Sequence, residues 1–403
     1  MPQHCETRFH TGLHRPKIVV PPPAGDQRIP PGYGDGAWPI HRLISRAERA
    51  HTSPPEVSLG ARLRSLVVAT FGQVLQDVNA VALLGYPGHR NAGDALIWDG
   101  QCALLRDLKI PILAVADHRS YDPSVIKDLP AGTAVLISGG GNFGDLYPDF
   151  ERFRHQILHD AAGRHVVQMP QSLYFRDPAA ADRARRAAAT HPSLVLTWRD
   201  ARSYRSGSEL FPRATSILVP DMAFAAEPPI LSGTTRVPVL SLARADSEGG
   251  ELRQVPLPEG RHSDWPAGGL RLSARSAVWK GLEADRRLGG FVGSGRVRRS
   301  LYRHAAAVTV RAATRLVSGA DVVVSDRLHA HILCTMLGVP HVMVDSGYGK
   351  IQAFVDSWTA GCPLLTMASS APEAIVLASK LAIAVGECGR SDGRGSRKTL
   401  PGA

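Results

Sequence analysis

One stretch decides the fold of this chain: residues 320–329, which read Ala-Asp-Val-Val-Val-Ser-Asp-Arg-Leu-His. The nearly all-apolar run Ala320–Val324 is typical of a buried strand, and polar residues arrive together where it ends. A helical stretch comes next, followed by the apolar run His341–Val344 and the turn Gly347-Tyr348-Gly349-Lys350. A strand, a helix and a second strand in this order predict part of a parallel α/β sheet.

The same stretch predicts where a ligand binds. In an open α/β sheet, ligands bind outside the carboxyl ends of the strands. Arg327, His329 and Lys350 all follow such ends, so we expect two cations and one imidazole to converge there. That set suits a small anion that carries both a phosphate and a carboxylate.

The alternation extends through most of the chain. Further strands are predicted at Val81–Leu84, Ala134–Ile137, His165–Gln168, Leu194–Thr197, Ile217–Val219 and Val237–Leu242. The helices predicted between them include Ala95–Leu108, Phe150–Ala161 and Ala179–Ala189. A break near Glu227-Pro228-Pro229 suits a linker. We therefore predict an α/β protein with two doubly wound domains that face each other across a cleft.

The domain boundaries follow from composition. Residues 1–60 are rich in Pro and Gly and predict a flexible lead-in, although a helix is expected from about Pro54 to Gln76. The two domains are expected at 61–227 and 228–386. Residues 387–403 are rich in Gly, Ser and Arg and predict a disordered tail.

Composition also narrows the class of protein. The 403 residues are 44% hydrophobic, and no apolar run reaches the roughly 18 residues of a membrane-spanning helix. The N-terminus lacks the apolar core of a secretory signal. Five cysteines are scattered without a C-x-x-C pair, which argues against a disulfide framework and a zinc site. We expect a cytoplasmic protein without a bound metal.

The net charge of +11 is concentrated in residues 271–315, which hold eleven Lys and Arg against two acidic residues. Such a patch attracts an anionic membrane surface, an anionic substrate or nucleic acid, or it is simply a solvated helix face. Nucleic acid is disfavoured because few aromatic residues interleave the patch. A peripheral contact with the inner face of the membrane is the hypothesis we retain.

Two glycine-containing loops follow predicted strands. In the first, Asn91 and Asp94 precede a helix expected to begin at Ala95, so Asp94 is a candidate N-cap, and Gly93 lets a ligand approach the backbone. In the second, residues 139–145, the glycines match a dinucleotide fingerprint. We reject that match because the next strand ends in Gln168-Met169-Pro170-Gln171, without an acidic residue for a ribose.

The two loops instead look like an acceptor pocket lined by Asn and Asp side chains. Asn142 and Asp145 in the second loop echo Asn91 and Asp94 in the first. Pro170-Gln171-Ser172 and Trp198-Arg199-Asp200 follow two further strands. Arg199 either points into the crevice or forms an ion pair with Asp200 or Asp221.

These loops, in this order, resemble the polysaccharide pyruvyl transferase family. The matching elements are Asn91 to Asp94, Gly139 to Asp145, Pro170 to Ser172, Arg199-Asp200, Pro220-Asp221, Ser325 to His329 and Gly349-Lys350. The resemblance covers about residues 80–355. It implies two Rossmann-like domains similar to the GT-B arrangement, phosphoenolpyruvate as donor and a sugar as acceptor. The product would be a pyruvate ketal on an exopolysaccharide, a cell-wall glycan or a glycolipid, including a lipid-linked sugar.

Carried over by position, the resemblance implies a role for each matching residue. The donor site would comprise Arg199, Arg327, Leu328, His329 and Lys350. The acceptor side would comprise Asn91, Asp94, Asn142, Asp145 and Gln171. His329 is the candidate general acid, and Asp94 or Asp145 the candidate base. No cofactor is expected beyond the donor substrate. The sequence departs from the family at Ala330, where a Gly is expected, and at His89-Arg90, which lengthen the first loop.

Two other functions remain open from the sequence. A nucleotide-sugar glycosyltransferase of the GT-B type would share the two-domain frame. It would require a glutamate or a similar group in the second domain for the ribose hydroxyls, but residues 345–350 end in Lys and contain no Glu. A non-catalytic sugar- or anion-binding protein is the second alternative, against which the acid-competent His329 among three cations argues.

Overall fold

A computed structural model describes residues 58–88, 91–231, 236–245, 250–265, 280–281, 295–345 and 349–392. All of them belong to one compact unit. Residues 1–57, the tail after 392 and most of 271–294 lie outside the described residues, as do His89-Arg90 and residues 346–348.

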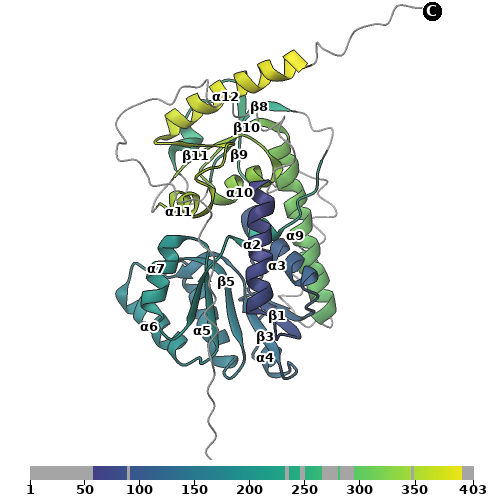
Figure 1. The fold of residues 1–403 in the computed structure, drawn as a ribbon, viewed down its shortest axis with the longest axis vertical. Coiled ribbons are helices and arrows are strands. Elements are labelled where there is room, and N and C mark those ends of the chain that lie inside the picture. The colour runs from purple at the N-terminus through teal and green to yellow at the C-terminus, as the bar shows by residue number, and fades with distance from the viewer. Residues whose placement is uncertain are drawn as a thin grey trace, which may run out of the picture. The chain divides into compact units, whose positions relative to one another are not determined.

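The first sheet has seven strands, all paired in parallel, with the order β2-β1-β3-β5-β6-β7 and β4 paired to β5 (Figure 1). Its strands are β1 (Ala80–Leu84), β2 (Ile112–Ala116), β3 (Thr133–Ile137), β4 (Gly140–Gly144), β5 (Val166–Tyr174), β6 (Leu194–Trp198) and β7 (Thr215–Leu218). The order reverses between β1 and β3. In a doubly wound sheet the ligand crevice lies at such a reversal.

Helices cover both faces of this sheet. They are α2 (Leu59–Val74), α3 (Ala92–Asp107), α4 (Ser124–Lys127), α5 (Pro148–Asp160), α6 (Pro178–Ala189), α7 (Ala201–Leu210) and the 3-10 helix η1 (Met222–Ala225). Successive residues of β1 point to opposite faces: Val81 and Leu83 join one core with α2 and α3, while Ala82 and Leu84 join another with α5. Burial on both faces explains why this strand is almost wholly apolar.

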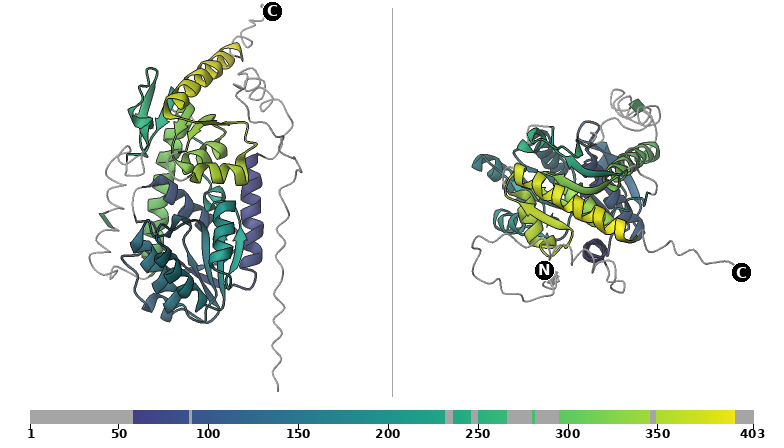
Figure 2. Two further views of the ribbon diagram at one scale, coloured as in Figure 1. Left: turned by 90° about the vertical axis from the view of Figure 1, so that its left-hand side faces the viewer. Right: turned by 90° about the horizontal axis from the view of Figure 1, so that it is seen from above.

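The second sheet has five parallel strands in the order β12-β11-β10-β8-β9. They are β8 (Val237–Leu242), β9 (Gly260–Ser263), β10 (Ala320–Ser325), β11 (His341–Val344) and β12 (Leu365–Ala368). The helices of this half are η2 (Glu251–Gln254), α9 (Gly295–Ser318), α10 (Leu328–Leu337), α11 (Lys350–Phe354), the π-helix η3 (Val355–Thr359) and α12 (Ala371–Asp392). Here the order reverses between β8 and β10, and α12 lies across the sheet (Figure 2).

The predicted fold class is confirmed: two parallel-stranded, Rossmann-like sheets alternate with helices. Every strand predicted from the sequence is present, within a few residues of its predicted ends, except that β5 continues for six residues past Gln168. The predicted first helix is α2, although it begins at Leu59 rather than near Pro54. The helix α12 continues to Asp392, past residue 387, where the predicted tail begins.

Helix α9 joins the two sheets. By sequence it precedes β10, yet its buried residues pack against α3 and β2 of the first sheet as well as against β10 (Figure 1). One apolar core accordingly contains Val81 and Leu83 of the first sheet together with Val323 of the second. None of the helices in the described ranges is long and apolar enough to cross a membrane.

Candidate active site

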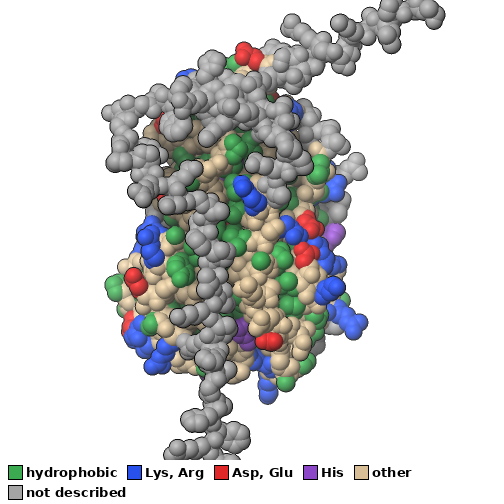
Figure 3. Space-filling view, in the orientation of Figure 1, with side chains coloured by type: hydrophobic (Ala, Val, Ile, Leu, Met, Phe, Trp, Pro, Cys, Tyr) green, Lys and Arg blue, Asp and Glu red, His purple; other side chains and the backbone are tan. Residues whose placement is uncertain are grey.

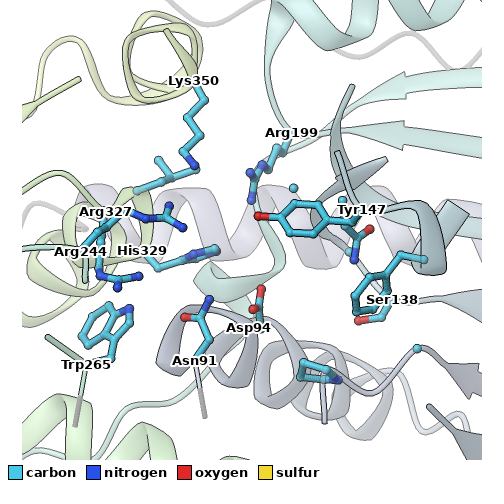
Figure 4. Close-up of a pocket in the computed structure, with 17 residues that line it drawn as sticks. Asn91, Asp94, Ser138, Tyr147, Arg199, Arg244, Trp265, Arg327, His329 and Lys350 are labelled. Carbon is cyan, nitrogen blue, oxygen red and sulfur yellow. The ribbon is translucent and has the colours of Figure 1, made fainter. Parts of the chain in front are cut away.

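A pocket of about 310 Å³ lies where the strand ends of both sheets meet. Its lining comes from the segments that follow β1, β3 and β6 in the first sheet and β8, β9, β10 and β11 in the second (Figure 4). The reversals of strand order, at β1/β3 and β8/β10, both border it. The pocket is therefore where the topology of each sheet places a ligand.

Arg199 follows β6 directly and is held on two sides. It is 3% exposed; its Nε donates to Ser172 Oγ at 2.8 Å, and its Nη1 donates to Asp221 Oδ2 at 2.8 Å. Its Nη2 lies against the backbone of Gly141, where an added Cβ would come within 2.9 Å. Arg199 thus lines the pocket and forms the ion pair that the sequence left as an alternative. The two interpretations are compatible.

Asp200, the other candidate partner of Arg199, has a structural role. It is the N-cap of α7, where its Oδ1 accepts the Ser203 N–H at 2.7 Å, and its Oδ2 accepts the hydroxyl of Ser172 at 2.7 Å. Because Ser172 in turn accepts from Arg199, Asp200 orients the guanidinium through one intermediate side chain.

Asp221 is a fully buried carboxylate behind the pocket. Its Oδ2 accepts from Arg199 and lies 3.6 Å from Nε2 of His329, while its Oδ1 accepts the Ala223 N–H at 2.8 Å. Burial alone raises the pKa of Asp221, but His329, Arg199 and the Ala223 N–H more than offset it and hold that pKa well below its usual range. Asp221 is therefore an ionised partner for both basic side chains.

His329 lies in the first turn of α10, and its imidazole is fixed by close packing. A Cβ added at Gly93 would overlap the ring, so a glycine is required opposite the imidazole. The Nε2 atom is buried and has no hydrogen-bond partner among the described residues; its distance to Asp221 exceeds hydrogen-bonding range. The sequence assigned Gly93 to ligand approach, whereas the neighbour that approaches it is His329.

Arg327 is the N-cap residue immediately before this helix and is 7% exposed. Its Nη2 lies 2.5 Å from Asp264 Oδ1, and its backbone N–H donates to Ser325 Oγ at 3.1 Å. The buried Asp326 accepts backbone N–H groups from Arg244 and Gly250 and so ties the loop after β8 to β10. The Ser-Asp-Arg run therefore builds the loop through Ser325 and Asp326 and presents Arg327 to the pocket.

Lys350 and Leu328 also line the pocket, as predicted. Lys350 is the first residue of α11 and follows Gly349, whose φ of 76° places the turn in the left-handed region that favours glycine. The structure thus brings all five predicted donor-side residues to one pocket, with Arg199 on the first sheet and the others on the second (Figure 4).

The predicted N-cap of α3 is wrong by three residues. Asn91, not Asp94, caps the helix: its Oδ1 accepts the Gly93 N–H at 2.9 Å, and the helix begins at Ala92. Asp94 lies inside the first turn and lines the pocket together with Asn91. An Asn side chain caps as well as an Asp does, so spacing from the apolar run could not distinguish them.

The second predicted acceptor loop is only partly at the pocket. Asn142 lines it, and the buried Gln171 lies behind, where its Nε2 donates to Asn142 Oδ1 at 2.8 Å and its Oε1 accepts the Asn142 N–H at 3.1 Å. Arg154 also donates to Asn142 Oδ1, at 3.0 Å. Gln171 therefore positions Asn142 rather than lining the pocket.

Asp145 is not among the residues that line the pocket. Both of its oxygens accept the backbone N–H of Arg176, and Oδ2 also accepts that of Asp177 at 2.7 Å. Residues 140–144 form the strand β4, so no helix begins directly after the glycines, in agreement with the rejected dinucleotide fingerprint. The carboxylate of Asp145 stabilises a loop. Asp145 and Asp94 are therefore alike in their sequence surroundings but not in their structural role.

Several residues that line the pocket were not predicted from the sequence. Arg244 comes two residues after β8 and Trp265 two residues after β9; Ser138 directly follows β3, and Tyr147 and Phe150 flank the start of α5. Arg244 could have been found because it follows a predicted strand. Trp265 could not, because β9 is a half-exposed edge strand without an apolar run.

Two known proteins that resemble this chain share the name of one class of transferase. The chain is 31% identical over 312 residues to "Pyruvyl transferase 1" of Schizosaccharomyces pombe (strain 972 / ATCC 24843). The matching region spans 74% of this chain and 75% of the yeast protein. It is 26% identical over 310 residues to the Bacillus subtilis (strain 168) protein EpsO, whose name also contains the words pyruvyl transferase. That match spans 76% of this chain and 92% of EpsO.

A likeness among solved structures supports the fold. The crystal structure of a functionally uncharacterized protein from Klebsiella pneumoniae subsp. pneumoniae NTUH-K2044 superposes with a TM-score of 0.51 at 16% identity, over 76% of this chain and 99% of that one. The sequence profile of polysaccharide pyruvyl transferases matches residues 91–348, which include nearly the whole lining of the pocket. The chain belongs to the polysaccharide pyruvyl transferase family.

Proposed function

We propose that this protein transfers the pyruvyl group of phosphoenolpyruvate to two hydroxyls of one sugar, forming a pyruvate ketal and releasing phosphate. The observation that carries the proposal is the convergence of Arg199, Arg327, Lys350 and His329 on one pocket. The acceptor would be a sugar of an exopolysaccharide, a cell-wall glycan or a glycolipid, reached from the cytoplasm.

The cationic side chains suit the two anionic groups of the donor. Arginine binds phosphate and carboxylate through paired N–H donors, and lysine contributes a point charge. Arg199 is fixed by its bonds to Asp221 and Ser172, and Arg327 by its contact with Asp264, so little ordering accompanies binding. The pocket volume of about 310 Å³ is at the low end for ligand sites and favours a compact donor over a nucleotide-sugar.

The first chemical step requires an acid. An imidazolium at His329 would donate its proton to the methylene carbon C3 of phosphoenolpyruvate, leaving C2 as an oxocarbenium ion. The buried carboxylate of Asp221, 3.6 Å from Nε2, stabilises that imidazolium electrostatically. Asp221 thus acts as a positioning residue for both His329 and Arg199.

The remaining steps balance without a cofactor. One sugar hydroxyl adds to C2 and loses its proton; the C2–O bond to phosphate then breaks, and phosphate leaves with the bonding electrons. The second hydroxyl adds to C2 and also loses its proton, which closes the ketal. The proton from His329 stays on the new methyl group. Of the two hydroxyl protons, one ends on the departing phosphate and the other returns through solvent to His329, which restores the acid.

The base for the hydroxyls would be Asp94. Of the two carboxylates suggested by the sequence, Asp94 lines the pocket, whereas Asp145 holds the loop at Arg176. Asn91 and Asn142, which also line the pocket, would hold sugar hydroxyls on that side.

The test is phosphate release from phosphoenolpyruvate, with and without a panel of galactosides, glucosides and mannosides. Acceptor-dependent release with a pyruvate-sized mass gain on the sugar is expected, and His329→Ala should abolish it while donor binding persists. Thermal shift that responds to UDP-sugars but not to phosphoenolpyruvate would replace the proposal with a glycosyltransferase. Binding without any turnover would favour a non-catalytic binding protein.

A further inference from the structure

A second cavity, of about 330 Å³, lies between α3, β2 and α9. It shares no lining residue with the candidate active site. Ile110 and Ile112 of its lining stand at the start of β2, the edge of the sheet opposite to the carboxyl ends that carry the active-site loops. The cavity is therefore a separate feature of the fold, and its occupant does not depend on the proposed function.

The rim of this cavity is basic. Arg296, Arg299 and Arg303 line it from α9, and their spacing of three and four residues places them on one face of that helix. Arg106 of α3 adds a fourth guanidinium. In Figure 3, Lys and Arg side chains stand along the edge of the molecule that α9 forms in Figure 1.

This positive charge is only partly compensated within the described part of the chain. Arg106 pairs with Asp107 Oδ1 at 3.1 Å and with Glu227 Oε2 at 3.0 Å, and Arg299 donates to the carbonyl of Leu113. No described residue of the lining is a carboxylate. Burial, together with the charge of Arg296, lowers the pKa of Arg299, so crowding the cations is unfavourable until an anion joins them.

The floor of the same cavity is apolar. Trp98, Leu105 and Val115 are buried in the core, and the half-buried Ile110 and Ile112 pack against it. A free inorganic anion would satisfy the rim and leave the half-buried Ile110 and Ile112 of this floor in contact with water. An occupant with a charged head and an apolar chain satisfies both.

We infer that the cavity between α3 and α9 binds a lipid phosphate, with the phosphate among Arg296, Arg299 and Arg303 and the start of the acyl or isoprenyl chain on the floor around Ile112. Nucleic acid is the less suitable occupant, because Trp98, the only aromatic among the described residues of the lining, is 1% exposed and offers no face on which a base could stack.

The experiment measures binding of dodecyl phosphate below its critical micelle concentration by isothermal titration calorimetry to the full chain. Inorganic phosphate and dodecyl maltoside serve as probes of the head and the chain alone. Saturable binding at least tenfold tighter than to either probe is expected. The double variant Arg296→Gln, Arg303→Gln, at two exposed positions, should weaken it at least tenfold, and Arg311→Gln, an exposed arginine of α9 outside the lining, should not.

Several outcomes would overturn the inference: dodecyl phosphate binding no tighter than inorganic phosphate, equal losses in the Arg311 variant, or tighter Arg296-dependent binding of a single-stranded oligonucleotide. Co-sedimentation with vesicles of phosphatidylglycerol against phosphatidylcholine then identifies the source. If the protein co-sediments with phosphatidylglycerol vesicles and this depends on Arg296 and Arg303, the lipid phosphate is supplied by a bilayer. If the protein binds dodecyl phosphate but not the vesicles, the ligand is a single lipid phosphate. Pyruvyl transfer is measured separately on the same variants and does not enter either result.

Discussion

The Nε2 atom of His329 lies 3.6 Å from Oδ2 of Asp221, the same oxygen that accepts the hydrogen bond from Arg199. His329 follows β10 of the second sheet, whereas Arg199 and Asp221 follow β6 and β7 of the first. One buried carboxylate thus links the candidate acid and a candidate phosphate ligand across the two sheets, which makes it a sensitive point of the site.

Replacing Asp221 by Asn should damage catalysis more than binding of the donor. The isosteric amide keeps the volume but removes the charge that stabilises an imidazolium at His329, so kcat should fall on the order of 100-fold. The KM for phosphoenolpyruvate should change far less than kcat. A variant that raises KM as much as it lowers kcat would show that Asp221 serves donor binding and not the acid. Circular dichroism and the Tm control for folding.

Gly93→Ala tests the packing of the imidazole. The new methyl group would overlap the ring of His329 and displace it, and displacements of about 1 Å cost on the order of 100-fold in rate. The matched control is Gly361→Ala, where an added Cβ meets no atom within 4 Å. Activity retained in Gly93→Ala would mean that His329 can shift without consequence, and would remove it from the role of acid.

The two candidate bases should separate cleanly. Asp94→Asn should lower kcat by roughly 100-fold or more if its carboxylate removes the hydroxyl proton. Asp145→Asn should leave kcat within a few-fold and lower stability slightly, because its oxygens accept only backbone N–H groups of Arg176 and Asp177. Steady-state kinetics with saturating donor and urea unfolding of both variants decide between them. The reverse pattern would make Asp145 the base.

Stability should fall between pH 6.5 and about 4 because of a buried histidine pair. His331 Nδ1 lies 2.7 Å from His341 Nε2, and His331 Nε2 lies 2.8 Å from Thr359 Oγ1. Burial lowers the pKa of His341 to about 4, and burial with the neighbouring His341 lowers that of His331 well below its usual value. Below pH 6.5 the unfolded chain binds protons that the folded chain does not. Each histidine therefore lowers the free energy of unfolding by up to about 1.4 kcal/mol for each pH unit of acidification.

Urea unfolding at pH 7, 6 and 5 measures this loss. In the double variant His331→Gln, His341→Gln, the free energy of unfolding should depend less steeply on pH over the same range. Asp221 contributes separately, since its depressed pKa gives stability that is present above pH 4 and is lost only in stronger acid. Equal slopes in the variant and the parent protein would contradict the assignment to this pair.

The strands of both sheets were largely predictable because burial on two faces leaves an apolar run in the sequence. β3, buried along its whole length, is an example. The half-exposed edge strand β9 leaves no such run and was not predicted. The edge strands β2 and β12 were not predicted either, although most of their residues are apolar. β4 was predicted as a loop because its glycines are poor strand formers, yet it pairs with β5.

The sequence by itself determined the α/β alternation, the positions of the loops after the strands and the basic residues that these loops carry to the pocket, because strand periodicity and residue type are local properties. Only the tertiary structure decided which loops meet. Arg244 and Trp265 line the pocket, whereas Asp145 does not. The ring of His329 packs against Gly93, and its Nε2 lies near the carboxylate of Asp221. The contacts of His329 with Gly93 and Asp221 join residues from the two sheets, and distances between distant segments depend on how the helices pack, which no local pattern encodes.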